Sequence, residues 1–261
     1  MIQRRLIPTY IFLTIFSIYS VFPFYWMISA ATNTMADVSR GRLIPGAYAA
    51  QNFRNLIDQQ PLSRAMGNSF AYAISVTLIC LFICSLAGYG FEVYHDKYKD
   101  LLFSILLLAM MIPLFKMFST AHLLNTIPGF FLPMISTPFM IMMFRQNARA
   151  FPIDIIEAAR MDGLREFQIF FRMFFPTMKS TYAAAAVITF MNAWNAYLWP
   201  VVCMTNGKTL NMVMLIANTT GGYVIDYGLI MMAVLFCSIP TMVVFFVLQK
   251  QFAEGITGAV K

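Results

Sequence analysis

The sequence predicts an all-α membrane protein with about six transmembrane helices. Of its 261 residues, 60% are hydrophobic and 11% are charged, whereas soluble domains are about 45–50% apolar and about 25% charged. A soluble fold of this length has too little interior to hide so much apolar surface. Lipid must therefore surround much of the chain, which we expect to form a single transmembrane domain over residues 1–261.

Six apolar stretches are long enough to cross a bilayer, which takes about 17–25 mostly apolar residues. They cover residues 6–30, 69–91, 101–124, 127–144, 180–204 and 228–248. The first exceeds the apolar part of a cleavable signal peptide, so we interpret it as a retained span. Prolines, Lys116 and His122 interrupt the third and fourth. Such breaks indicate either a stretch packed inside a helix bundle or simple kinks, and the sequence leaves both open.

The positions of the basic residues predict which loops face the cytoplasm. With the N-terminus inside, the inner segments hold about twice as many lysines and arginines as the outer ones. Both termini and the loop at residues 145–179 are therefore predicted to be cytoplasmic. Phe53, Leu56 and Ile57 indicate a short amphipathic helix in the long outer segment between the first two spans. The net charge of +7 comes without a long basic tail, which argues against nucleic acid as a partner.

The loop at residues 145–179 carries clear helix boundaries. Pro152 and Asp154 are typical of a first turn, where the helix dipole favours negative charge. Gly163 is typical of a C-terminal cap, because it can adopt the left-handed conformation. The two boundaries predict a helix of two to three turns, and Ala158 and Ala159 on it would let the backbone of a partner approach closely.

A second helix is predicted from Leu164 to Pro176. Four aromatic residues are expected to line one of its faces: Phe167, Phe170, Phe171 and Phe174. Together the two helices are expected to form a rigid knob at the membrane surface.

One motif in this loop resembles the EAA loop of ABC importer permeases. Glu157-Ala158-Ala159 is followed by three residues and Gly163, then by nine residues and Met173-x-Phe175-Pro176. The spacing of the family pattern is kept, with Met and Phe in place of the usual Ile and Leu. Trp194–Pro200 and the tail at residues 251–261 resemble the carbohydrate-uptake permeases of the maltose-importer G-subunit type. The stretch between Met111 and Asn125 is shorter than is usual in that family.

The resemblance implies a type I ABC importer permease in the bacterial inner membrane. Its partners would be a second, different permease, two ATPase subunits and an extracytoplasmic solute-binding protein that delivers a sugar. ATP and magnesium would be used by the ATPase, and this chain would bind no cofactor or metal and catalyse no reaction. The coupling helix that docks on the ATPase would consist of Glu157, Ala158, Ala159, Arg160, Met161, Asp162 and Gly163.

Other functional classes fit the sequence less well. Gly207-Lys208-Thr209 lacks the glycine that a phosphate-binding loop requires five positions before its second glycine, since Val202 stands there. A stand-alone secondary carrier or channel would need membrane-embedded acids to couple transport to an ion gradient, and no acid lies deep in the predicted spans. An intramembrane enzyme would need a catalytic constellation, which the two histidines and four cysteines do not suggest.

Two asparagines in the fifth span are candidates for the substrate path. The amides of Asn192 and Asn195 could hydrogen-bond sugar hydroxyls, with Trp194, Tyr197 or Trp199 stacking on a sugar face. Alternatively, the asparagines could link helices by hydrogen bonds, which we favour from the sequence because the second permease could supply most substrate contacts. Which sugar or related solute is carried stays open.

Overall fold

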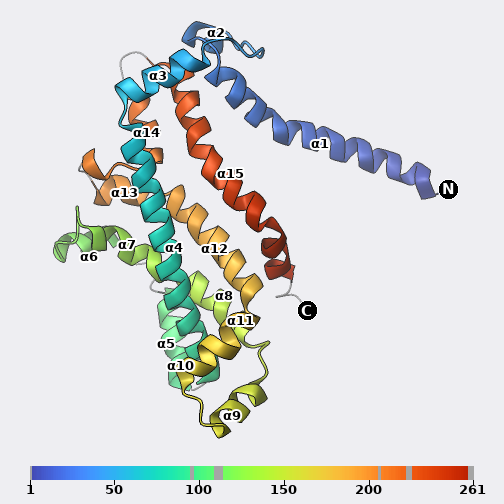
Figure 1. Cartoon of the computed structure of the whole chain (residues 1–261), viewed down its shortest axis with the longest axis vertical. Coiled ribbons are helices and arrows are strands. Elements are labelled where there is room, and N and C mark those ends of the chain that lie inside the picture. The colour runs from blue at the N-terminus through green and yellow to red at the C-terminus, as the bar shows by residue number, and fades with distance from the viewer. Residues whose placement is uncertain (1, 95–96, 109–113, 205–206, 222–224, 258–261) are drawn as a thin grey trace. The chain divides into compact units, whose positions relative to one another are not determined.

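The computed structural model describes residues 2–94, 97–108, 114–204, 207–221 and 225–257 (Figure 1). Within these residues the chain is helical and contains no strand, which confirms the predicted all-α fold. The helices form two compact units. One comprises Met1–Met66 and Asn211–Pro240, and the other comprises Gly67–Leu210 and Thr241–Lys261.

Four helical stretches of the described residues are long and apolar enough to cross a membrane. The first lies in α1 (Ile2–Ala31), the second is α4 (Leu62–Val93), and the last lies in α15 (Tyr227–Thr257). The remaining stretch, Ile127–Ala148, comprises α7 (Ile127–Ile135) and α8 (Pro138–Ala148). These four overlap the predicted first, second, sixth and fourth spans.

The helical part of the predicted third span, residues 101–124, ends earlier than predicted. It contains most of α5 (Lys97–Leu108) and all of α6 (Leu114–Thr120), while residues 109–113 lie outside the described part. After α6 the chain turns at His122 and Asn125, whose φ angles are 54° and 59°. A left-handed conformation cannot continue a right-handed helix, so the helical part ends before Leu124.

The predicted fifth span, residues 180–204, is likewise divided in two. Its parts are α12 (Lys179–Trp194) and the short α13 (Leu198–Cys203), separated by residues 195–197. Pro200 explains the break, because it has no N–H to donate to the carbonyl of Ala196 and its ring would clash there. A proline fits best in the first turn of a helix, where its missing N–H has no partner to lose, and Pro200 lies in the first turn of α13.

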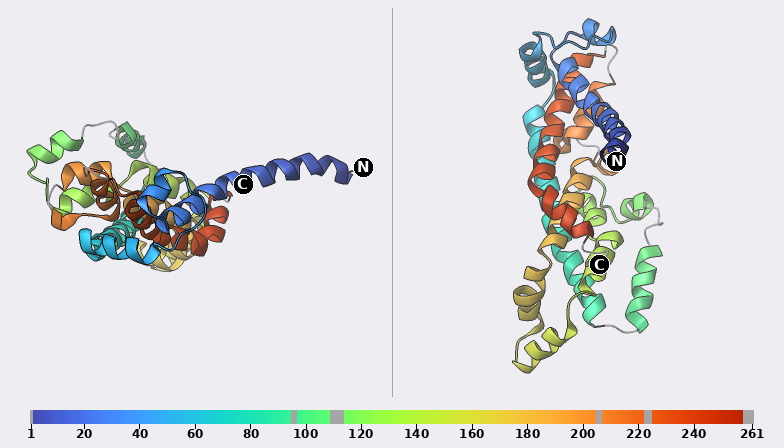
Figure 2. Two further views of the ribbon diagram at one scale, coloured as in Figure 1. Left: turned by 90° about the horizontal axis from the view of Figure 1, so that it is seen from above. Right: turned by 90° about the vertical axis from the view of Figure 1, so that its right-hand side faces the viewer.

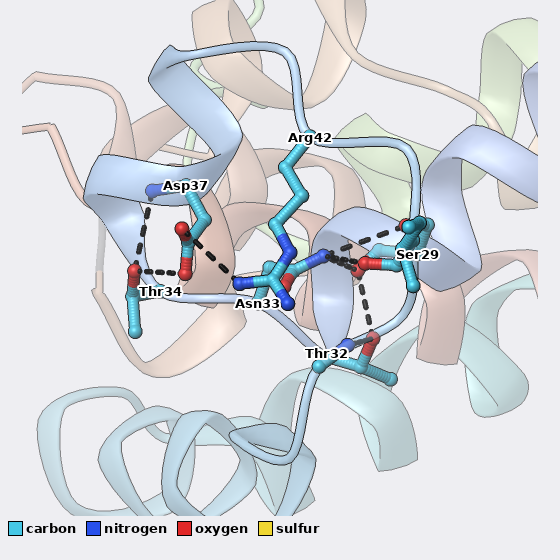
Figure 3. A network of polar contacts seen from close by, with 8 residues as sticks. Ser29, Thr32, Asn33, Thr34, Asp37 and Arg42 are labelled. Atoms are coloured by element: carbon cyan, nitrogen blue, oxygen red, sulfur yellow. Dashed lines mark hydrogen bonds and ion pairs between the residues drawn. The ribbon is translucent and has the colours of Figure 1, made fainter.

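In the first unit, hydrogen bonds fix the segment that follows α1 (Figure 3). The amide of Asn33 donates to the carbonyls of Ser29 and Ile44, both at 2.9 Å. Thr34 caps α2 (Met35–Ser39) by accepting from the N–H of Asp37 at 3.2 Å. The predicted short amphipathic helix is present as α3 (Ala49–Gln59), with Leu56 fully buried. The unit also contains α14 (Met212–Thr219).

The second unit has a core between α4, α5, α8 and α12. Cys80 and Cys84 lie in it, with their sulfur atoms 3.6 Å apart and no disulfide between them. A glycine allows α4 and α8 to approach closely, since a Cβ added to Gly88 would lie 2.6 Å from the Cβ of Phe144. Any larger residue at Gly88 would push the two helices apart.

Candidate functional site

The predicted short helix of the EAA-like loop is present as α9 (Ile153–Met161). Pro152 precedes it with extended backbone angles, and Asp154 lies in its first turn. Its end is a Schellman motif, in which the N–H of Leu164 donates to the carbonyl of Ala159 and that of Gly163 to the carbonyl of Arg160, both at 3.0 Å. Gly163 has a φ of +77°, so the predicted left-handed glycine cap is confirmed.

The two sides of α9 differ in exposure. Ile156 and Ala159 are each 1% exposed and pack against the rest of the unit. Glu157, Ala158 and Met161 are exposed, and Met161 keeps 90% of its accessible surface. The expectation that both alanines admit a partner's backbone is therefore wrong for Ala159, which is part of the core. Ala158 alone offers a small side chain on the outer face.

The second helix of the loop contains an unexpected π-helical turn. It begins as α10 (Glu166–Ile169), passes through π-helical Phe170–Phe174 and ends as α11 (Phe175–Thr177). Pro176 explains this turn, because a proline inside a regular α-helix would clash with the carbonyl four residues before it. The N–H of Phe175 donates to the carbonyl of Phe170, five residues earlier.

The four phenylalanines of this second helix do not share one face. Phe170 and Phe174 are buried, whereas Phe167 and Phe171 are 66% and 47% exposed. The prediction that all four line one face is therefore wrong. The two exposed rings are four residues apart, and so are the two buried ones, so each pair lies on its own side of the helix.

Buried aromatic rings hold α9 and α10 to the C-terminal part of α4. The two short helices lie next to each other at that end of α4 (Figure 1, Figure 2). The rings of Tyr89 and Phe174 have centroids 4.8 Å apart, and those of Phe151 and Phe174 are 5.7 Å apart. We call the following set the aromatic cluster: Tyr89, Ala148, Phe151, Ile156, Ala159, Ile169, Phe170, Phe174 and Met178. Through this cluster, α9 packs directly against α4, one of the helices long enough to cross a membrane.

An ion pair ties the end of α9 to the start of α10. The Nε of Arg160 lies 2.7 Å from Oε1 of Glu166, and the hydroxyl of Tyr89 donates to Oε2 of the same carboxylate at 3.4 Å. The hydrogen bond from Arg160 lowers the pKa of Glu166, although desolvation opposes this shift. The guanidinium of Arg160 also lies over the ring of Tyr94, 5.6 Å from its centroid.

A second ion-pair group joins α4 to α8. Glu92 accepts from Nε of Arg145 and from Nε of Arg149, both at 3.3 Å. Arg145 is only 6% exposed and its guanidinium lies 4.8 Å from the ring centroid of Phe103. Sequence reasoning assigned no structural role to Glu92, Arg145 or Tyr89, because their partners are more than fifty residues away in the chain. The one available sign was a charged residue at the end of an apolar span.

The two candidate asparagines lie near the end of α12 but in different surroundings. Both are exposed, but only Asn192 lines a small cavity, whereas Asn195 is the C-cap residue of the helix. Neither amide makes a hydrogen bond to another residue that the structure describes, so they do not link helices within that part. Trp194 is 1% exposed and packs against Phe70 and Phe190, which leaves it no free face for a sugar.

The fold and the loop together define an inner-membrane transport component. The chain belongs to the family described as binding-protein-dependent transport system inner membrane component, whose model matches residues 2–258. Family membership makes it a permease subunit of an ABC importer, a membrane protein that works with an ATPase and a solute-binding protein.

Named relatives and one solved structure agree with this assignment. The lactose transport system permease protein LacG of Rhizobium radiobacter is 39% identical over 100% of this chain and 98% of its own length. The sn-glycerol-3-phosphate transport system permease protein UgpE of Escherichia coli (strain K12) is 30% identical, with 92% of each chain covered. A bacterial ABC transporter involved in the import of the acidic polysaccharide alginate contains a chain of the same fold. Its TM-score is 0.87 at 20% identity, with 96% of this chain and 97% of that chain covered.

Proposed function

We propose that this permease imports a sugar and that an ATPase subunit drives it by pushing and pulling on α9. The observation that carries the proposal is the outer face of α9, where Glu157, Ala158 and Met161 are exposed beside a fully packed inner face. A short helix with one buried and one free face, on the predicted cytoplasmic side, suits insertion into a cleft of a partner.

The connection of α9 to α4 is what makes the proposed coupling effective. An ATPase can shift a two-state membrane protein only through a contact whose free energy differs between the two states. The aromatic cluster and the Arg160–Glu166 pair give α9 little freedom to move independently of α4. Displacement of α9 would therefore be passed to α4 instead of being absorbed within the loop.

The proposal assigns the remaining roles to other chains. Two ATPase subunits would bind ATP and magnesium, a second and different permease would complete the pathway, and this chain would be non-catalytic. Both termini would lie in the cytoplasm of a bacterial cell, as the distribution of basic residues predicts. LacG and UgpE are named for lactose and sn-glycerol 3-phosphate, and a third relative, AraQ of Bacillus subtilis (strain 168), is named for arabinooligosaccharides. These names support a hydroxyl-rich solute.

A cysteine crosslink tests the docking face. All four native cysteines are buried, so Ala158→Cys would add an exposed thiol. We expect it to crosslink to a cysteine in the ATPase cleft within the assembled complex. Ala159→Cys is the matched control, since its side chain is 1% exposed and should give no crosslink. If the crosslink never forms at Ala158, or forms equally at Ala159, the docking assignment is wrong.

Uptake by the reconstituted complex tests the solute class. The complex would be offered labelled lactose, an arabino-oligosaccharide and glycerol 3-phosphate together with its binding protein and ATP. We expect ATP-dependent uptake of a sugar and none by this chain alone. Uptake by this chain alone, driven by an ion gradient, would instead establish the secondary carrier that the sequence leaves as the alternative.

A further inference from the structure

A small cavity with polar atoms lies among α4, α7, α8 and α12. Its volume is about 110 Å³. Apolar walls come from Val76, Pro133 and Met140, and polar atoms come from Thr137, Thr189 and Asn192. All of these residues belong to the unit that contains Gly67–Leu210. Most ligand sites share this combination of apolar walls and a few convergent polar groups.

The hydroxyl of Thr189 is the unusual group in this cavity. Thr189 is 5% exposed, and its Oγ1 is buried without a hydrogen-bond partner among the described residues. A threonine inside a helix commonly donates to the carbonyl four residues earlier. Thr77 in α4 does so, with its Oγ1 2.7 Å from the carbonyl oxygen of Ala73. Thr189 does not donate to the carbonyl four residues earlier. Its neighbouring polar group is the thiol of Cys80, which hydrogen-bonds only weakly and leaves most of the hydroxyl's capacity unused.

The cavity borders a break between two half-helices. α7 ends at Ile135 and α8 begins at Pro138, with Thr137 as its N-cap residue. The side chain of Thr137 does not cap the helix and lies beside the thiol of Cys80, which is a weak hydrogen-bonding group. Interrupted helices at membrane depth persist where they line a cavity, and transporters commonly bind solutes at such breaks.

We propose that this cavity is a subsite for the hydroxyl groups of the permeating sugar. The inference rests on the proposed function, because it takes the solute to be a sugar. Thr137, Thr189 and Asn192 provide donors and acceptors in the lining of the cavity, which match the paired donor and acceptor character of a sugar hydroxyl. At about 30 Å³ per water molecule, the volume corresponds to about four waters. It therefore admits part of a sugar ring with its hydroxyls, which would replace that water.

The subsite includes Asn192 and excludes Asn195. Both residues are exposed, but only Asn192 lines the cavity, whereas Asn195 is the C-cap residue of α12. The exclusion provides a matched control, because both changes remove an amide from the same helix end. Thr77→Val is the corresponding control for Thr189→Val, because the hydroxyl of Thr77 is bonded within its own helix.

Uptake kinetics of the full complex test the subsite. The probe is lactose, or whichever of the three solutes above the wild-type complex takes up. We expect Thr189→Val and Asn192→Ala each to lower the sugar uptake rate by about fivefold or more. ATPase activity stimulated by the loaded binding protein should stay within about twofold of wild type. Each substitution removes a hydrogen bond to the solute, but it leaves the proposed contact between α9 and the ATPase unchanged. Thr77→Val and Asn195→Ala should leave both activities unchanged.

The outcomes separate this inference from the proposed function. If the wild type and the controls take up sugar and the two cavity variants do so equally well, the subsite is wrong and the proposed function stands. If ATPase activity falls in parallel with uptake in the cavity variants, these residues are structural and the subsite is again wrong. If the wild type takes up no sugar and Ala158→Cys gives no crosslink, the proposed function itself has failed.

Thiol labelling tests access to the cavity independently of uptake rates. A cysteine at Asn192 should react with a small charged thiosulfonate, and the transported sugar should slow this reaction. Val243→Cys on α15, a substitution at an exposed apolar position, should react slowly and without sugar protection. The unmodified chain, with its four buried cysteines, gives the background. Labelling at Asn192 that the sugar does not slow would overturn the subsite.

Discussion

Two regions of the same unit differ in whether their polar side chains have hydrogen-bond partners. In the loop region, the carboxylate of Glu166 contacts Arg160 and Tyr89, and Glu92 pairs with two arginines. In the cavity region, the hydroxyl of Thr189 has no partner among the described residues. A buried polar group without a partner reduces stability, so such a group persists where another requirement outweighs the cost.

The difference matches two mechanical tasks. A segment that transmits a displacement must keep its contacts in both states, and dense aromatic packing with paired charges does this. A segment that a solute must enter and leave needs polar groups that can change partners. The loop region and the cavity region are therefore expected to respond differently to the same kind of substitution.

The largest expected effect comes from truncating the centre of the aromatic cluster. Phe174 is fully buried and contacts the rings of Tyr89 and Phe151. Phe174→Ala should lower the free energy of unfolding of this region by about 3–5 kcal/mol, through lost burial and a cavity. Thermal unfolding of the purified chain in detergent measures it. Phe167→Ala, at a position 66% exposed, is the control and should change little. Equal effects of the two changes would contradict the observed division of the phenylalanines.

A smaller loss is expected at the glycine that ends α9. Gly163 has a φ of +77°, and a Cβ added there would meet nothing within 4 Å. Gly163→Ala should therefore cost about 1–2 kcal/mol from backbone strain alone. Gly67→Ala is the matched control, because Gly67 lies within α4, also has open space, and has no left-handed angle. There alanine should stabilise the helix by about 0.5–1 kcal/mol. Opposite signs in thermal unfolding would confirm the cap, and like signs would contradict it.

The cavity region should respond with a gain. Thr189→Val keeps the side-chain shape and removes the buried hydroxyl, so it should raise the free energy of unfolding by about 1 kcal/mol. Thr77→Val removes a bonded hydroxyl and should be neutral or destabilising. The measurement is the unfolding temperature of each variant in detergent. A loss at Thr189 as large as that at Thr77 would show that its hydroxyl is satisfied in the folded protein.

The sequence was sufficient to predict features that depend on local backbone chemistry. Pro152 and Gly163 bracket α9 as predicted, because each acts through its own backbone angles. The all-α fold follows equally directly from composition. The family was identified from a motif whose spacing survives two substitutions, at Met173 and Phe175.

Features that depend on distant residues or on helix irregularity were not predictable. The burial of Phe174 and exposure of Phe171 depend on which side of the helix packs against Tyr89 of α4, a contact between residues far apart in the chain. The pairing of Glu92 with Arg145 joins residues 53 positions apart. Thr189 carried no sign of its role, because a threonine in an apolar helix usually satisfies its own hydroxyl.

The smallest expected effect is a pH-dependent one at the Arg160–Glu166 pair. Arg160 lowers the pKa of Glu166 in the folded protein, so the pair stabilises the fold fully above the ordinary glutamate pKa of about 4.3. This stabilisation is lost as the pH falls through the lowered folded-state pKa. Both side chains are more than a third exposed, so the pair contributes about 0–1 kcal/mol.

Comparison of the wild type with Glu166→Gln across pH isolates that contribution. The variant should unfold at a lower temperature near neutral pH, and the difference should vanish at acid pH and shrink with added salt, which screens exposed charges. Glu157→Gln is the control, since Glu157 forms no ion pair with the described residues, and its difference from wild type should not follow this pattern. A difference at Glu166 that persists unchanged at acid pH would mean that hydrogen bonding by the uncharged group, and not the ion pair, holds α10 to α9.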